Sequence, residues 1–316
     1  MKEDLIEKFK RWAENKVDIK SIIVIGSSVR NQQKGDKYSD IDFIIFTKDP
    51  FIYEKSVTWI DEIHKSVSFH NGFEISKGTF VKRIFFENEV AVDITFLSSK
   101  LLSAILIFTT LKEKGNYFLS VLSKKKIKEI ENQILSFTYY LHRGYHFIVD
   151  KNNTEEKVKK IISQFGYKTE YSFELKDFEV VVNRFWQNAY RMAYKIKRNE
   201  LFTAKLEIEP EMKQDLLNII SIYTKHVNGS DFETWHKGKF IEKWADPVIV
   251  EKLKLIYGEY NVESSWRSLK STIDLFVHIS DLLYKVDKFQ TITKPQEYFY
   301  NWIAEIEQTT TNITHT

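Results

Sequence analysis

The segments SIIVIGS at residues 21–27 and SDIDFIIF at residues 39–46 decide the fold of this chain. In the first, a β-branched run ends at Gly26, which is typical of a buried strand that closes in a sharp turn. In the second, an apolar run precedes Asp49-Pro50, where the proline stops any ladder of hydrogen bonds. Two buried strands so close together predict a sheet in the first part of the chain.

More strands and helices are expected around these two strands. Residues 79–86 and 90–97 are rich in Val, Ile, Phe and Thr on either side of Glu87-Asn88-Glu89, so they predict two antiparallel strands joined by a tight turn. Three further elements are predicted by their periodicity or composition: a helix over 2–16, a helix over 122–141 and a strand over 146–149. The result is a mixed β-sheet flanked by helices.

The pattern changes to helical after residue 177, where strand signals nearly vanish. Helices are predicted over 177–196, 211–226, 248–257, 262–285 and 295–307. We therefore expect an α+β protein with a sheet-containing domain over 1–160 and an all-helical domain over 161–308. The boundary falls within the polar, turn-rich region 151–176, and a disordered tail is expected over 309–316.

Composition narrows the classes of function. The 316 residues include no cysteine, which excludes disulfides, iron–sulfur clusters and thiolate zinc sites and fits a cytoplasmic protein. The formal net charge of +3 does not require a nucleic-acid partner. The apolar run from Leu101 to Phe108 is too short to cross a bilayer, so no membrane span is expected.

Three aspartates carry the predicted chemistry. Asp40 and Asp42 stand two residues apart on an extended segment, so both carboxylates project to the same side. Asp93 interrupts the otherwise apolar run VAVDITF at residues 90–96, where a buried carboxylate is costly unless a cation compensates its charge. If the two strands are neighbours, the three carboxylates predict a site for one or two Mg²⁺ ions.

The turn after the first strand is the predicted phosphate site. Gly26 lets the backbone approach a phosphate closely, Ser27 adds backbone and hydroxyl donors, and Arg30 adds a positive charge. A helix beginning at Ser27 or Ser28 would direct its positive end at the same anion. With the metal, these groups would hold a nucleoside triphosphate, and Asp93 is the candidate acceptor for a hydroxyl proton.

Each motif also has an ordinary structural explanation. A Gly-Ser pair alone is a common turn, and a lone Asp-x-Asp is more often a solvated loop or a helix cap. Their combination between buried strands, with a third aspartate about fifty residues later, favours the functional interpretation.

Gly26-Ser27, Asp40-x-Asp42 and Asp93 together resemble the motifs of the DNA-polymerase-β-like nucleotidyltransferases. Within that superfamily, the chain resembles the aminoglycoside 6-adenylyltransferases, also called streptomycin adenylyltransferases, over nearly its full length. The supporting stretches are Tyr38-Ser39-Asp40-Ile41-Asp42, Gly144 to Lys151, Asn183-Arg184-Phe185-Trp186, Arg198-Asn199-Glu200-Leu201 and Trp235-His236-Lys237-Gly238-Lys239.

This resemblance implies a nucleotidyltransferase domain followed by a helical substrate domain. It implies transfer of AMP from ATP to a hydroxyl of a streptomycin-like aminoglycoside, with release of pyrophosphate. Asp40, Asp42 and Asp93 would hold Mg²⁺, and Lys239, in a segment that resembles the family's glycine–lysine segment, would contact a phosphate.

Departures from the family pattern leave other functions open. Ser28 and Val29 intervene before Arg30, Ala91-Val92 replaces an arginine or similar residue before the third aspartate, and Arg184 replaces an acidic residue. A polycationic aminoglycoside favours carboxylates, so Arg184 predicts a diverged acceptor. The alternatives are another acceptor, such as a lincosamide, a protein or a transfer RNA, and a nucleotide-binding protein without catalysis.

Overall fold

The computed structural model describes residues 2–30, 34–65, 67–76, 78–87, 90–115, 122–166, 175–285 and 296–311. The chain divides into two compact units, Met1–Glu170 and Tyr171–Thr316, called here the first and the second unit. The elements of the first unit are α1 (Lys2–Glu14), β1 (Ile19–Ile25), η1 (Gly26–Ser28), β2 (Ile41–Thr47), α2 (Phe51–Lys55), α3 (Thr58–Ile63), β3 (Val67–Ser76), β4 (Thr79–Phe86), β5 (Val90–Ser98), α4 (Ser99–Glu113), α5 (Lys124–His142), β6 (His146–Asp150) and α6 (Thr154–Phe165). Those of the second unit are α7 (Leu175–Lys197), α8 (Leu201–Thr203), η3 (Ala204–Ile208), α9 (Glu209–Asn228), η4 (His236–Gly238), α10 (Ile241–Trp244), α11 (Pro247–Leu253), α12 (Val262–Tyr284) and α13 (Gln296–Thr311).

The sheet of the first unit is mixed and has the strand order β3-β4-β5-β2-β1-β6. β2 and β5 run parallel, and the other neighbouring strands are antiparallel. This order places β5, which is distant in sequence, directly beside β2. The predicted fold class, a mixed sheet flanked by helices and followed by a helical region, is confirmed.

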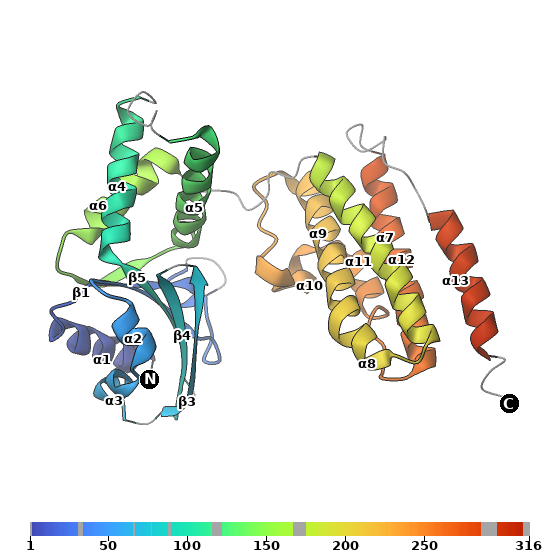
Figure 1. Cartoon of the computed structure of the whole chain (residues 1–316), viewed down its shortest axis with the longest axis horizontal. Helices are drawn as coiled ribbons and strands as arrows, with labels where there is room; N and C mark the ends of the chain where they lie inside the picture. Colours follow the sequence, from blue (N-terminus) through green and yellow to red (C-terminus); the bar gives the residue numbers. More distant parts are fainter. Residues whose placement is uncertain are drawn as a thin grey trace. The chain divides into compact units, whose positions relative to one another are not determined.

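Helices cover the sheet on both faces (Figure 1). On one face, Phe9 and Trp12 of α1, Tyr53 of α2 and Trp59 of α3 pack on a layer of strand residues that includes Phe43. On the other face, side chains of α4, α5 and α6 pack on a smaller set of strand residues, which are Ile23, Ile44 and Phe46. Alternation along the strands therefore assigns odd and even residues of β2 to different cores.

The second unit is a helical assembly with a core of its own. α7, α9 and α12 pack against one another, and the rings of Phe185 and Phe276 stack at a centroid distance of 3.6 Å in the centre. The helices predicted over 177–196, 211–226, 248–257, 262–285 and 295–307 correspond to α7, α9, α11, α12 and α13. α13 is described to Thr311, so the end of the predicted tail lies outside the described residues.

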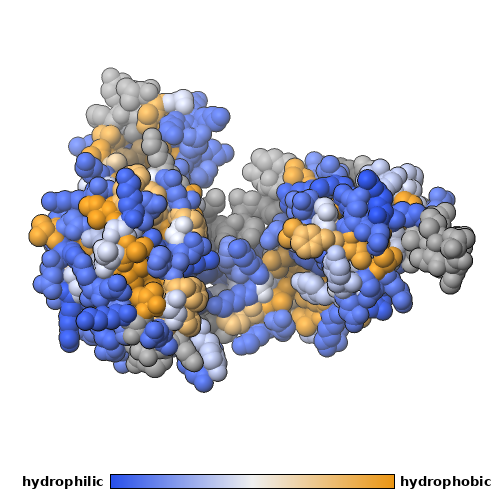
Figure 2. All heavy atoms as spheres, turned by 60° about the horizontal axis from the view of Figure 1, so that its bottom comes forward, coloured by the Kyte–Doolittle hydropathy of each residue, from blue (hydrophilic) through white to orange (hydrophobic). Residues whose placement is uncertain are grey.

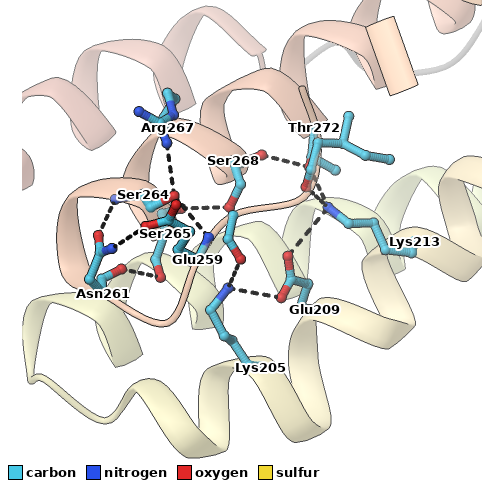
Figure 3. A network of polar contacts seen from close by, with 12 residues as sticks. Lys205, Glu209, Lys213, Glu259, Asn261, Ser264, Ser265, Arg267, Ser268 and Thr272 are labelled. Atoms are coloured by element: carbon cyan, nitrogen blue, oxygen red, sulfur yellow. Dashed lines mark hydrogen bonds and ion pairs between the residues drawn. The ribbon is translucent and has the colours of Figure 1, made fainter. Parts of the chain in front are cut away.

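A largely buried lysine joins three segments of the second unit. Lys213 of α9 donates hydrogen bonds of 2.6 Å to the carbonyl oxygen of Ile256 and to Oγ1 of Thr272 in α12. Its Nζ also lies 3.6 Å from a carboxylate oxygen of Glu209 (Figure 3). Burial lowers the pKa of Lys213 to about 8, against the attraction of Glu209. The Lys213 ammonium group therefore has hydrogen-bond partners, but they do not fully offset the free-energy cost of removing it from water.

Several elements were absent from the prediction, and the three longest are β3, α4 and α6. β3 was not expected, α4 occupies the apolar run around 101–108 that carried no assignment, and α6 lies in the region predicted to be polar and turn-rich. None of the described helices combines the length and the apolar character that a membrane crossing requires.

Candidate active site

The structure brings the three predicted aspartates together. Asp42 lies in β2 directly beside Asp93 in the parallel register with β5, and Asp40 precedes β2 by one residue. One carboxylate oxygen of each lies within 4.8 Å of those of the other two, and all three side chains are half-buried. The two residues in register share one face of the sheet, and Asp40, two residues before Asp42, projects to the same side.

The donor set fits a small divalent cation. It consists of carboxylate oxygens alone, which Mg²⁺ prefers, and ligands on opposite sides of one ion are about 4.2 Å apart at Mg–O distances of about 2.1 Å. A cation would also relieve the repulsion between three anionic groups this close together. Asp40, Asp42 and Asp93 are therefore the residues that would hold the metal.

Asp93 has an altered proton affinity. Burial raises the pKa of its carboxyl, the ion pair with Arg83 opposes that rise, and the nearby charge of Asp40 adds to it. Nε of Arg83 lies 3.0 Å from Oδ2 of Asp93. Without a bound cation, this carboxylate is therefore a stronger base than a carboxylate in water.

Arg83 is a residue of the site that the sequence analysis missed. It lies opposite Asp93 in the antiparallel pairing of β4 and β5. The signal was present, because the predicted hairpin around residues 87–89 pairs Phe86 with Val90, and continuing that pairing sets Arg83 against Asp93.

Gly26 has a role beyond the one predicted. Its backbone adopts φ +73°, and a Cβ built on it would lie 2.0 Å from Oδ2 of Asp42. The absent side chain thus leaves room for the Asp42 carboxylate itself, and the left-handed φ turns the chain away from β1. The predicted approach of this backbone to a phosphate stays a prediction.

The turn after Gly26 differs from the expected helix start. Gly26–Ser28 forms a single 3₁₀ turn, and within the described residues no α-helix begins at Ser27 or Ser28. The helix-dipole argument for this turn was therefore wrong, since three residues without a following helix provide no macrodipole.

Ser27 and Arg30 both lie in this turn region with buried side chains. Ser27 Oγ has no hydrogen-bond partner within the part of the chain that the structure describes, and the backbone nitrogen of Gly35 donates to the Ser27 carbonyl over 2.9 Å. The turn between α5 and β6 packs on the same segment, since a Cβ on Gly144 would lie 2.7 Å from the Val29 carbonyl oxygen. An orphaned buried hydroxyl in the residue after Gly26 is compatible with an oxygen-rich ligand.

Lys239, the remaining predicted phosphate contact, belongs to the second unit. It follows η4, and its carbonyl oxygen accepts a hydrogen bond of 2.9 Å from Nε1 of Trp244. Three neighbours other than glycine, Trp235, Lys237 and Phe240, have positive φ values. Its assignment to a phosphate stays a prediction.

Arg184 is paired within the second unit. Its guanidinium donates two hydrogen bonds from Nε, of 3.0 and 3.1 Å, to the carboxylate of Asp215, which is fully buried. The substitution of an acidic residue by Arg184 therefore comes with a counter-charge on α9, so the change does not leave an unbalanced positive charge.

Comparisons with known proteins agree on one family. The family model described as streptomycin adenylyltransferase matches residues 1–306. An aminoglycoside 6-adenylyltransferase of Staphylococcus aureus is 20% identical over 285 residues, which cover 88% of this chain and 89% of the relative.

Two solved structures are also similar. One is an aminoglycoside 6-adenyltransferase from Bacillus subtilis, with a TM-score of 0.39 and 15% identity over 96% of this chain and 97% of that one. The other is a nucleotidyltransferase-like protein from Exiguobacterium sibiricum, with a TM-score of 0.31 and 11% identity over 88% of this chain and 76% of that one. Because the family model covers almost the whole chain, this protein belongs to the streptomycin adenylyltransferase family of nucleotidyltransferases.

Proposed function

We propose that this protein transfers AMP from ATP to a hydroxyl of a streptomycin-like aminoglycoside in a Mg²⁺-dependent reaction. The observation that carries the proposal is the cluster of Asp40, Asp42 and Asp93 beside the turn at Gly26, in a chain of this family. Bound Mg²⁺ would supply electrostatic stabilisation of the phosphate oxygens and fix the orientation of the triphosphate.

The chain's own residues account for the remaining requirements. Asp42 lies in β2, which is held between β1 and β5, and Asp40 directly precedes this strand. Ser27 and Arg30, in the turn that follows Gly26, are candidate phosphate contacts that offer a hydroxyl and a positive charge. Lys239 is a further candidate phosphate contact.

Asp93 is the proposed acceptor for the proton of the attacking hydroxyl. As the hydroxyl oxygen bonds to the α-phosphorus, the bond from that phosphorus to the oxygen bridging to the β-phosphate breaks, and pyrophosphate leaves. The proton moves to the Asp93 carboxylate, which the ion pair with Arg83 orients.

The test is direct. Purified protein incubated with ATP, Mg²⁺ and streptomycin should produce streptomycin heavier by one AMP group, with one pyrophosphate released for each modified molecule. The mass gain and pyrophosphate should both be absent without the acceptor. If no aminoglycoside gains mass while ATP binds, the proposed acceptor class is wrong.

A further inference from the structure

The strand residues beside the three aspartates form a continuous row across the sheet. By the pairings of β2 with β5, β5 with β4 and β4 with β3, Asp42, Asp93, Arg83 and Asn71 are successive neighbours. Their side chains therefore share one face. That face continues the site outward to the edge strand β3.

Aromatic side chains flank this row on both sides. Phe69 pairs with Phe85, and their rings stack with centroids 5.1 Å apart, while Phe73 pairs with Val81 on the other side of Asn71. Phe69 is 63% exposed and Phe73 is 39% exposed. The opposite face of β4, with Ile84 and Phe86, is buried.

Exposed aromatic rings at the edge of a catalytic cluster need a reason. The space-filling view shows hydrophobic side chains at the surface of the first unit among larger hydrophilic areas (Figure 2). Exposing a phenylalanine ring to water is unfavourable. The exposed rings of Phe69 and Phe73 therefore mark a surface that a ligand can cover. The direct continuity with Asp93 indicates that the ligand is one that reaches the reacting atoms.

The contacts of Arg83 show which chemistry this face accepts. Its guanidinium carbon lies 5.5 Å from the centroid of the Phe73 ring while its Nε pairs with Asp93. A planar cation is thus already held between an aromatic ring and a carboxylate. Ring faces of phenylalanine attract ammonium and guanidinium groups through their quadrupole.

Charge on the same face limits the alternatives. Among the described residues of β3, β4 and β5, Asp93 is the one carboxylate on this face, and Arg83 neutralises it. A polycationic acceptor finds no free carboxylate there, so the aromatic rings are the groups left to stabilise its charges.

We propose that Phe69, Phe73 and Phe85 form an acceptor platform that binds the amino- or guanidino-substituted ring of the acceptor and directs its hydroxyl toward Asp93. This inference rests on the proposed function and names a binding site for its acceptor. Arg83 acts as a positioning residue, because it holds Asp93 and contacts Phe73 at once.

The platform is tested with the full-length protein and streptomycin as the probe. Phe69→Ala and Phe73→Ala should each raise the KM for streptomycin about tenfold, and the double variant more, while the KM for ATP changes less than twofold. Phe73→Tyr, which keeps a ring, should recover most of the affinity that Phe73→Ala loses. Circular dichroism checks that each variant is folded.

Phe51→Ala is the matched control. Phe51 is 46% exposed and its ring contacts Phe80, on the opposite face of β4 from Arg83. This variant should leave both KM values unchanged. An unchanged KM for streptomycin in the double variant, or an equal rise in Phe51→Ala, overturns the platform while the proposed function stands.

Calorimetric measurement of streptomycin binding without ATP distinguishes failure of the proposed function from failure of the acceptor platform. If the wild type transfers no AMP but binds streptomycin, and Phe69→Ala/Phe73→Ala weakens that binding, the proposed function fails and the platform stands. If the wild type neither transfers AMP nor binds streptomycin, both are overturned.

Discussion

Because Gly26 has no side chain, the carboxylate of Asp42 has room to lie close to those of Asp40 and Asp93. The position combines a left-handed φ with a Cβ site that the Asp42 carboxylate already occupies. The chemistry of the site therefore depends on a residue that offers no functional group.

Replacing Gly26 by alanine should abolish AMP transfer. The new Cβ would lie 2.0 Å from Oδ2 of Asp42, so the carboxylate or the turn must move, and we expect a loss of about 100-fold or more in kcat/KM. The left-handed φ adds a cost of about 1 kcal/mol to the folded state. Activity and urea unfolding of the variant measure the two effects.

Gly78→Ala is the control for this variant. Gly78 has φ +77°, and a Cβ there would meet nothing within 4 Å. The Gly78→Ala variant should be less stable, because alanine disfavours this φ, and it should retain AMP transfer. Equal activity losses in both variants would show that backbone strain, and not contact with Asp42, is responsible.

Single residues also show what sequence alone can reveal. Asp40 and Asp42 were recognisable from their spacing of two residues on an extended segment, and Asp93 because a carboxylate within an apolar strand is costly to bury. Arg83 could have been found from the hairpin register. The pairing of Arg184 with Asp215 could not, because it joins α7 to α9 across 31 positions of sequence.

At the scale of elements, the alternating pattern of the strands determines which residues lie on each face of the sheet. The order of the strands determines which of those residues are neighbours. Apolar runs predicted β1, β2, β4 and β5, but not that β5 lies beside β2 and parallel to it. β3 was missed because its sequence, VSFHNGFEIS, mixes polar residues and a glycine with three apolar side chains that stay exposed. Its pairing with β4 is what makes it a strand.

The elements of the second unit are joined by Lys213, and this predicts a pH dependence of stability. The folded chain releases the Lys213 proton above about pH 8, whereas the ordinary value, expected in the unfolded chain, is 10.5. Between these values the unfolded chain binds more protons, so raising the pH favours the folded state, by up to about 1.4 kcal/mol per pH unit.

Urea unfolding of the wild type and Lys213→Met at pH 7, 8, 9 and 10 measures this effect. The free energy of unfolding of the wild type, relative to the variant, should rise between pH 8 and pH 10. Lys254→Met is the control, because that lysine side chain is 65% exposed. The difference in free energy of unfolding between the wild type and Lys254→Met should stay constant from pH 7 to pH 10. A constant difference between the wild type and Lys213→Met would contradict the buried-ammonium account.

For the whole molecule, hydrophobic patterning indicated the change from a sheet-containing part to a helical part. The apolar cores of the first unit are separate from the core of the second unit. Composition along the chain could therefore reveal the change from a sheet-containing part to a helical part. α6 belongs to the first unit although its region seemed polar, because a few apolar residues, including Val158 and Ile161, suffice to pack one face of a short helix.

The central claim is that three carboxylates act as one metal-dependent site. Its most direct measurement is Mn²⁺ binding in the presence of ATP, followed by electron paramagnetic resonance, together with AMP transfer to streptomycin in Mg²⁺. Wild-type protein should bind the ion and transfer AMP, while Asp42→Asn and Asp93→Asn should weaken binding at least tenfold and abolish transfer. Unchanged ion binding and transfer in both variants would contradict the account.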